Sequence, residues 1–392
     1  MDTEKKTLIE NYAVVIGDWH FNSLGMIRSL GEKDIPVVYI NLSDAGYGET
    51  SKYTVKTYHA REDGSNITEV LFEVLNDFKG KPVIFTGCDK AALALDNAYS
   101  FLKDKCYFPN LKGNANFYMN KENMCKAAKE SGFIIPETET FNFDNSFIEN
   151  VTSFGFPCIL KPVLSVEGNK ADIQICENIE ELQSVYRNFL KSEENYSRIL
   201  VQRFLKGTHI QMLDYSGCKT KNSLVDVYGQ LEKTREYPIS RGSTSYAVIK
   251  KNIQHFNTDS LDKFLEAVGY EGLFDLDFML VDSTPFFIEI NFRNGAISYA
   301  FTKAGFNIPY IWYCKVLGLD YQKPKISETI LMCERDDLNH VKDRNIGLLK
   351  WLKDVRKTDV FMLFNKNDPQ PFINAYNKIV NFIFSIITKR SK

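Results

Sequence analysis

The chain has 392 residues, of which 48 are basic and 50 are acidic, so its net charge is −2. A hydrophobic content of 44% with 13% aromatic residues is typical of a globular protein and excludes wholesale disorder. The length predicts about two to four domains, and the even charge balance gives no basis for a nucleic-acid partner.

The amino-terminal segment and the cysteines indicate where the protein works. The first ten residues, MDTEKKTLIE, carry acids that exclude a secretory signal peptide. No uncharged apolar run approaches the roughly 20 residues that a membrane span needs. The eight cysteines are scattered, with no CxxC pair, which favours free thiols in a reducing compartment. We therefore expect a cytoplasmic protein, attached at most to the inner face of a membrane.

The first third of the chain alternates between two patterns. Short β-branched runs take turns with helical periodicity, a pattern typical of βαβ units around a parallel sheet. This predicts an open α/β domain over residues 1–115, with strands at 13–16, 36–40 and 82–86 and helices at 24–30, 66–78 and 91–102.

The middle of the chain predicts two further units. A helix at 121–130, a hairpin from 156–162 and 171–176, and a helix capped by Asn178 suggest a small α+β module over 116–195. Strand-like runs then predict a larger, mostly antiparallel unit over 196–325. An extension over 326–392, ending in an amphipathic helix, completes the predicted organisation.

The segment 269–295 carries the most informative chemistry. It reads as two strands joined by a turn, and alternation places Asp275 with Asp277 on one face and Glu289 with Asn291 on the same face of the next strand. Carboxylate and amide oxygens suit Mg²⁺, whose remaining ligands are usually nucleotide phosphates. Arg293 continues the alternation and suits the same phosphates. The alternative is a hairpin whose polar face is simply solvated.

The order of these parts resembles a known family. Lys121 precedes a helix, Lys161 ends a strand, a run QRFLKGTH follows, and the pattern Glu289–Asn291–Arg293 comes last with Asp277 upstream. This order resembles the ATP-grasp superfamily of carboxylate ligases over residues 13–320. The segments VIGDWHFNSLGMIRSLGE and EINFRNG are similar to the D-aspartate ligase type of bacterial cell-wall enzymes.

The resemblance implies an ATP-grasp fold: an open α/β domain, a small α+β lid and a larger antiparallel-sheet domain that holds Mg-ATP. It implies ATP as cofactor, with one or two Mg²⁺ ions, or Mn²⁺ in their place, held by Asp277, Glu289 and Asn291. The other implied nucleotide contacts are the phosphate-binding Lys121 and Lys161, the flap residues Ser165 and Gly168, the adenine-binding Gln202, Phe204 and Leu205, and His209.

Two of these positions and one loop depart from the family's pattern. Gln202 replaces an acid that is often found there, and His209 stands where a ribose-binding glutamate is common. The loop after Lys161 is short, with one glycine. An exposed strand histidine and an ordinary hairpin loop are the structural alternatives.

The resemblance assigns three arginines to catalysis. Arg293 is expected to stabilise the transferred phosphoryl group, whereas Arg235 and Arg241 lie in a Gly-Ser-Thr-rich hairpin that the family places near the acyl phosphate. Paired arginines suit a carboxylate or phosphate substrate. A basic, solvated hairpin is the alternative.

The expected activity is an ATP-dependent carboxylate–amine ligase. ATP would convert a carboxylate into an acyl phosphate, and an amine would displace the phosphate to give an amide. The partners are thus a small-molecule acid and a small-molecule amine. A thiol or bicarbonate partner remains an alternative, and so does a nucleotide-binding module without turnover.

The segment Pro371–Lys392 carries a separate signal. It has four basic residues, no acid, and apolar residues at near-helical spacing. Three readings stay open: packing on the core, contact with an anionic membrane, and an oligomer contact such as a homodimer.

Overall fold

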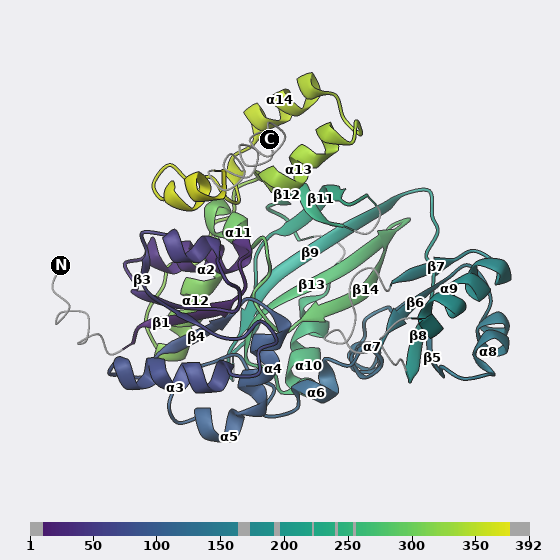
Figure 1. The fold of residues 1–392 in the computed structure, drawn as a ribbon, viewed down its shortest axis with the longest axis horizontal. Helices are drawn as coiled ribbons and strands as arrows, with labels where there is room; N and C mark the ends of the chain where they lie inside the picture. The colour runs from purple at the N-terminus through teal and green to yellow at the C-terminus, as the bar shows by residue number, and fades with distance from the viewer. Residues whose placement is uncertain are drawn as a thin grey trace, which may run out of the picture.

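Within the described part of the chain, the strands form three β-sheets (Figure 1). The computed structural model describes residues 11–163, 173–191, 197–221, 223–239, 242–253 and 256–376. A long, mostly antiparallel sheet occupies the centre of the molecule. A parallel sheet formed by the amino-terminal part of the chain lies on one side of it, and a small antiparallel sheet lies on the other. Among these residues no helix combines the length and apolar character that a membrane span requires.

The amino-terminal domain is a parallel sheet between helices. Its strand order is β3-β2-β1-β4, and β1 pairs in parallel with both β2 and β4. The strands are fully buried apolar runs except β3, whose side chains are mostly half-exposed at the sheet edge. The elements are β1 (Ala13–Gly17), α2 (Phe21–Gly31), β2 (Val37–Asn41), the 3₁₀-helix η1 (Tyr47–Thr50), β3 (Thr54–His59), α3 (Ile67–Asp77), β4 (Val83–Thr86), α4 (Asp89–Asn97), α5 (Tyr99–Leu102) and α6 (Ala115–Tyr118).

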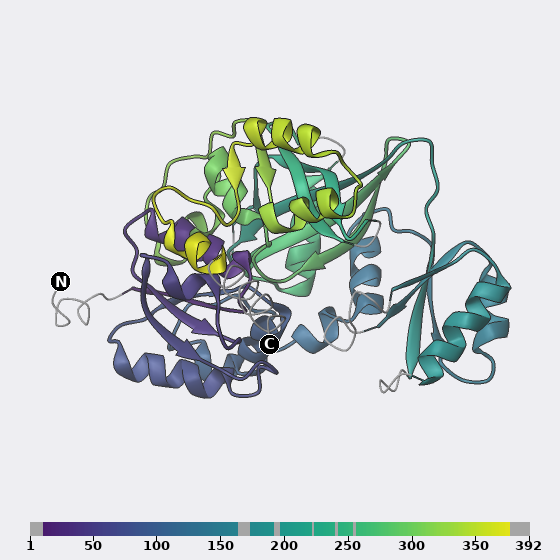
Figure 2. The same cartoon turned by 45° about the horizontal axis from the view of Figure 1, so that its top comes forward.

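The small antiparallel sheet forms a separate lid with its own core. Its strand order is β5-β8-β6-β7, and two helices cover it through a cluster of phenylalanine, leucine and valine side chains. The lid comprises β5 (Thr138–Asn142), α8 (Phe147–Phe154), β6 (Cys158–Pro162), β7 (Gln174–Cys176), α9 (Ile179–Lys191) and β8 (Arg198–Arg203). The tilted view shows it standing apart from the rest of the chain (Figure 2).

The central sheet has eight strands among the residues that the structure describes. Its main path runs β14-β13-β9-β11-β12-β15-β16, with β10 beside β9. The strands of this sheet are β9 (Ile210–Lys219), β10 (Asp226–Val227), β11 (Gln230–Tyr237), β12 (Ser243–Lys250), β13 (Gly272–Val281), β14 (Thr284–Asn291), β15 (Thr329–Met332) and β16 (Val360–Phe361). The remaining helices of the chain are α7 (Lys121–Glu130), α10 (Thr258–Val268), α11 (Ser298–Ala304), α12 (Ile308–Leu317), α13 (Glu334–Lys342) and α14 (Leu348–Lys357).

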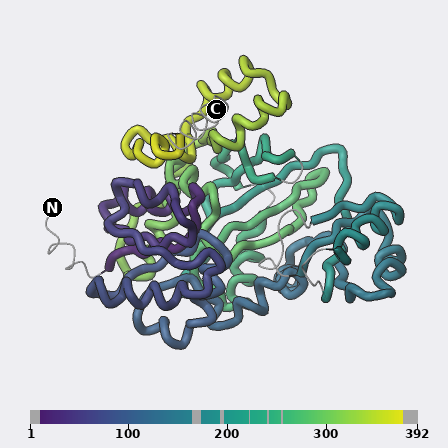
Figure 3. Tube along the Cα trace, viewed as in Figure 1, coloured from purple at the N-terminus to yellow at the C-terminus, as the bar shows by residue number. Residues whose placement is uncertain are grey.

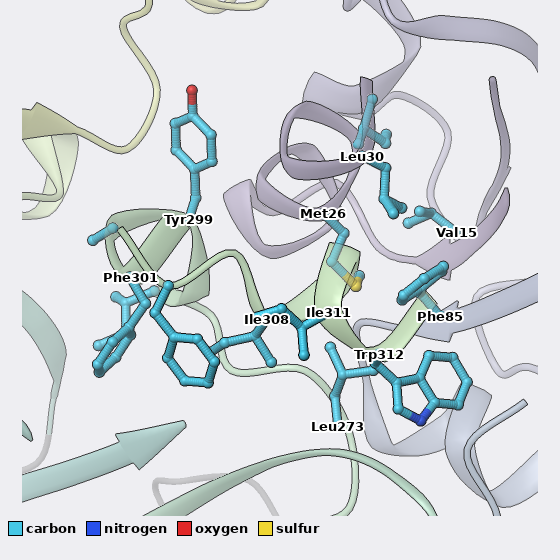
Figure 4. Packing of buried hydrophobic residues seen from close by; sticks show 14 of the residues in the cluster. Val15, Met26, Leu30, Phe85, Leu273, Tyr299, Phe301, Ile308, Ile311 and Trp312 are labelled. Atoms are coloured by element: carbon cyan, nitrogen blue, oxygen red, sulfur yellow. The ribbon is translucent and has the colours of Figure 1, made fainter. Parts of the chain in front are cut away.

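The two faces of the central sheet bury different partners. One face packs against α7 and α10 through alternating residues such as Phe274, Leu276 and Phe278. The other face shares a core with the amino-terminal domain, in which Leu273 meets Trp312 of α12 and Phe85 of β4 (Figure 4). Any side chain that alternates with the first set therefore faces the amino-terminal domain.

Packing and strand pairing cross the domain boundaries predicted from the sequence, and those boundaries stay a prediction. The predicted lid, 116–195, starts with α7, but α7 packs on the central sheet, and β8 pairs in the lid although it falls in the predicted large unit. The tube view follows the chain out to the lid and back through β9 (Figure 3). Within the predicted extension, β15 pairs with β12 of the central sheet. Sequence patterns indicate local elements but not their pairing partners.

Candidate functional site

The β13–β14 hairpin places acidic residues side by side, as predicted. Asp277 lies directly opposite Glu289, and Asp275 lies directly opposite Asn291. A two-residue turn at Asp282 and Ser283, both with positive φ, joins the strands. Because their neighbours fill the core against α7 and α10, these polar side chains face the amino-terminal domain.

A third strand adds another acid to the same face. Asp214 of β9 pairs with Asp277 on the side away from Glu289, so three carboxylates stand in a row across β9, β13 and β14. The Oδ1 atom of Asp214 is buried and has no hydrogen-bond partner among the described residues. Burial and the charges of Asp275 and Asp277 raise the pKa of Asp214 well above its usual value.

The pKa of Asp277 is raised to about 7 by burial and by the charges of Asp275 and Glu289. A carboxyl whose pKa is raised by folding stabilises the native state only while it is protonated. That contribution is complete below the unfolded value near 4 and is lost as the pH rises through about 7.

We expect Asp277→Asn to raise the free energy of unfolding at pH 8, because it removes a charge that its neighbours repel, and to change it little at pH 4.5. Urea unfolding at both pH values measures this. Asp282→Asn is the control and should lower the free energy of unfolding at pH 8, because hydrogen bonds from Thr208 and His209 lower the pKa of Asp282. An Asp277→Asn variant that loses stability at pH 8 contradicts the prediction.

Arg293 lies beside this acidic row. Its Nε donates to Asp89 Oδ1 at 3.2 Å, its Nη1 donates to the carbonyl of Asn294 at 3.1 Å, and its Nη1 is 3.7 Å from Asp275 Oδ2. Burial lowers the pKa of Arg293, but the charges of Asp89, Asp275 and Glu289 outweigh burial and raise it. The guanidinium therefore stays charged next to the carboxylates.

Lys161 lies close enough to Glu289 and to Lys121 for both charges to act on its ammonium group. The Lys161 ammonium donates to Gln202 Oε1 at 2.8 Å, and Gln202 in turn donates to Thr138 Oγ1 at 3.0 Å. Burial lowers the pKa of Lys161, the charge of Glu289 opposes that effect, and the charge of Lys121 adds to it. Two lysines close enough to repel are suited to a shared anion such as a phosphate chain.

The other predicted nucleotide contacts are placed less distinctively. Phe204 and Leu205 follow β8 outside regular structure, and the Phe204 N–H donates to the Pro157 carbonyl at 3.1 Å. His209 is exposed, and its backbone N–H donates to Asp282 Oδ1 at 3.0 Å. Ser165, Gly168 and Arg241 lie outside the described residues.

Arg235 is not brought to the carboxylate row. Its Nε and Nη2 bind both oxygens of the fully buried Asp337, at 2.9 and 2.8 Å, and its Nη1 binds Asp354 at 2.7 Å. The guanidinium also lies over the ring of Tyr246. These contacts join β11 to α13 and α14. A role for Arg235 toward substrate stays a prediction, and the ion pairs weigh against it.

The donor set fits Mg²⁺ bound together with phosphates. Asp277 and Glu289 supply two opposed carboxylates, and Asn291 lies one alternation further along β14. Among the described residues, no group of three or more histidine, cysteine, aspartate or glutamate side chains is arranged to hold a metal ion. Mg²⁺ commonly takes one or two carboxylates plus substrate phosphates, so two protein carboxylates suffice when a nucleotide is bound.

Two residues of this site were not predicted. Asp214 lies in an apolar strand, and only its register against β13 shows that it faces Asp277. Asp89 follows β4, and the carboxyl ends of parallel strands are the usual ligand-binding edge of an open α/β sheet. The sequence TGCDK, a strand end followed by a helix start, was the available signal for Asp89.

Comparison with known proteins places this site in a family. Residues 118–296 match the family model described as "ATP-grasp domain". The chain contains an ATP-grasp domain. The matched region spans the Lys121, Lys161, Asp277 and Glu289 positions, and the fold around it is the ATP-grasp fold.

The ATP-grasp domain has relatives in sequence and in structure. The formate-dependent phosphoribosylglycinamide formyltransferase of Wolinella succinogenes is 24% identical over 196 residues, which are 49% of this chain and 48% of the relative. The match thus spans about half the length of that curated relative.

Two solved structures share the ATP-grasp fold over most of the chain. N5-carboxyaminoimidazole synthetase from Staphylococcus aureus, complexed with ADP, covers 87% of both chains with a TM-score of 0.68 and 13% identity. The L-amino acid ligase from Bacillus licheniformis covers 81% of this chain and 75% of its own, with a TM-score of 0.60 and 15% identity.

Proposed function

We propose that the chain is an ATP-dependent carboxylate–amine ligase. The γ-phosphoryl group of ATP passes to a substrate carboxylate, and a substrate amine then displaces the phosphate to form an amide. ADP and phosphate are the other products. The observation that carries the proposal is the convergence of two carboxylates and two cations. Asp277 and Glu289 are opposed on β13 and β14, Lys161 lies on β6, and Arg293 follows β14.

The residues present account for both parts of Mg-ATP. Lys121 and Lys161 would neutralise phosphate oxygens, and Gln202 holds the Lys161 ammonium in place. Asp277, Glu289 and Asn291 would hold the metal. Mg²⁺ held there would offset the charge of the phosphate oxygens, which is most of what phosphoryl transfer needs. Arg293 would stabilise charge on the transferred group.

The location of the acidic row supports a substrate site at the domain junction. The row faces the amino-terminal domain, and the Asn294 N–H donates to the carbonyl of Thr86 at the end of β4. The carboxyl edge of the parallel sheet and the acidic face of the central sheet therefore meet. An acid bound there would lie beside Arg293 and the phosphates, as acyl phosphate formation requires.

We expect Lys161→Ala to weaken Mg-ATP binding about 10- to 100-fold, because it removes a charge-assisted contact to phosphate. Isothermal titration calorimetry measures the affinity directly. Lys206→Ala is the matched control, since this lysine follows β8 on the surface and pairs with Glu177. An unchanged affinity in Lys161→Ala would remove this lysine from the site.

The experiment that tests the function is ADP release from Mg-ATP across pools of acids and amines, with products identified by mass spectrometry. The proposal expects release that needs one acid and one amine and a product lighter by one water than the two together. Release that needs bicarbonate or a thiol instead of an amine favours the second partner class. ATP binding without release in any pool favours a binding module.

Three finer predictions stay with this proposal. Similarity to the D-aspartate ligase type points to an amino acid such as aspartate as the acid and to a role in the cell envelope. Most of the Pro371–Lys392 segment, which motivates membrane contact at the inner face, lies outside the described residues. A homodimer is the third, because two-fold dimers are the commonest assembly.

A further inference from the structure

Arg293 is held by a carboxylate from a different domain. Asp89 is the first residue of α4 in the amino-terminal domain and lies 204 positions before Arg293, yet its Oδ1 accepts the Arg293 Nε–H at 3.2 Å. Both side chains are largely buried, with exposed fractions of 27% and 18%. A pair at this depth is screened less by solvent than a surface ion pair.

Backbone contacts fix the segment that carries Arg293. The N–H of Asn294 donates to the Thr86 carbonyl at 3.0 Å. The Asn22 amide donates to the carbonyls of Gly87 and Asn294, at 2.8 and 3.0 Å, and accepts from the Asn294 amide at 2.6 Å. The turn after β4 and the segment after β14 thus form one hydrogen-bonded unit, and Asp89 belongs to it.

Gly295, which follows Asn294, leaves room for the Asp275 side chain beside Arg293. A Cβ on Gly295 would lie 2.3 Å from Asp275 Oδ1 and 2.9 Å from Ser216 Oγ, so a larger residue would displace Asp275. Asp275 accepts from Ser216 Oγ at 2.8 Å and lies 3.7 Å from Arg293 Nη1. The guanidinium is therefore fixed from two domains along Nε and Nη1.

The remaining guanidinium nitrogen is the one that can reach a ligand. Within the described part of the chain, the hydrogen bonds that Arg293 donates come from Nε and Nη1. Asp89 binds Nε, on the side of the guanidinium away from the Asn294 carbonyl on Nη1. A guanidinium with fixed Nε and Nη1 presents Nη2 in a defined direction, which is how a preorganised donor acts on developing charge.

We propose that Asp89 is a positioning residue: it holds the Arg293 guanidinium in the orientation that contacts the transferred phosphoryl group. The amino-terminal domain thereby completes the phosphoryl-transfer site of the ATP-grasp domain. This inference rests on the proposed function. The alternative is a purely structural acid in the first turn of α4, where a carboxylate also favours the helix dipole.

Binding of a phosphoryl mimic separates the two roles without the unknown acid and amine. The affinity for Mg-ADP is measured alone and with aluminium fluoride, which imitates the phosphoryl group in transfer. For Asp89→Ala, the affinity for Mg-ADP should stay within about 2-fold of wild type, while the tightening by aluminium fluoride should fall about 10-fold or more, since a misplaced contact costs up to about 100-fold.

Two further variants supply rescue and control. Asp89→Asn keeps an oxygen that can accept from Nε, so its tightening should return to within about 3-fold of wild type. Asp77→Ala removes another aspartate of the same domain, which pairs with Lys56 on the surface, and should behave as wild type. Thermal unfolding of each variant checks the fold.

Three outcomes would overturn the inference. Full tightening in Asp89→Ala shows that Arg293 needs no such partner. Equal weakening of both affinities, without rescue by Asp89→Asn, shows a structural role. A wild-type protein that binds no Mg-ADP, or shows no tightening, refutes the proposed function itself and this inference with it.

Discussion

Glu289→Gln should lower ATP turnover by about 10²- to 10³-fold while leaving the fold intact. Removal of one charged or donor group from a preorganised site has an effect of this size. Glu289 lies directly opposite Asp277, and its charge is one reason why the pKa of Asp277 is raised to about 7. The amide keeps the shape of the side chain but removes half of the paired carboxylate charge.

The same change should stabilise the protein without nucleotide. Repulsion between Asp277 and Glu289 is relieved, so the free energy of unfolding at pH 8 should equal or exceed that of wild type. Loss of turnover together with unchanged or higher stability separates a site residue from a folding residue. Glu271→Gln is the control, since this glutamate precedes β13 and only approaches Lys112 at the surface. Retained ATP turnover in Glu289→Gln would contradict the assignment of Glu289 as a ligand of Mg²⁺.

Arg28→Met should destabilise the protein by about 3–5 kcal/mol, the cost of leaving one partner of a buried ion pair unpaired. Arg28 of α2 and Asp368 are both almost fully buried, with 2.9 Å between Nε and Oδ2. Arg28 also donates to the carbonyls of Met362, Leu363 and Asp368. The arginine thus joins the amino-terminal domain to the last described segment of the chain.

Urea unfolding of three variants tests this ion pair. The double variant Arg28→Met with Asp368→Leu removes both charges and should lose less than Arg28→Met alone. Arg198→Met breaks an exposed pair with Glu122 and should cost under about 1 kcal/mol. If Arg28→Met and Arg198→Met lower the free energy of unfolding by equally small amounts, the buried ion pair does not stabilise the contact between the amino-terminal domain and the last described segment.

The local elements were predictable because their patterns are local. The alternation in the β13–β14 segment placed Asp277 and Glu289 on one face, and the register confirms that they are opposed. The helix predicted at 121–130 matches α7, and the Asn120 side chain caps its start. The ATP-grasp fold was predicted from the order of a few residues, and the family match and the structural neighbours confirm it.

The features that the sequence did not predict depend on contacts between distant segments of the chain. Strand β5 has half-exposed residues and was not predicted, because only pairing with β8 makes it a strand. The family resemblance assigned Arg235 to the substrate site, which stays a prediction. Its ion-pair partners Asp337 and Asp354 lie more than 100 positions away, so the sequence alone did not reveal them. Asp214 and Asp89 join the site through sheet register and domain packing, which a single sequence does not display.

Transfer of oxygen from the substrate acid to phosphate tests the central claim most directly. Once a pool yields product, the acid is labelled with ¹⁸O in its carboxylate, and the released phosphate is examined by mass spectrometry. The proposed acyl phosphate predicts one ¹⁸O atom in each phosphate, because the amine displaces phosphate together with the bridging carboxylate oxygen. Phosphate that carries no label, in a reaction that still forms the amide, would contradict activation of the carboxylate by ATP.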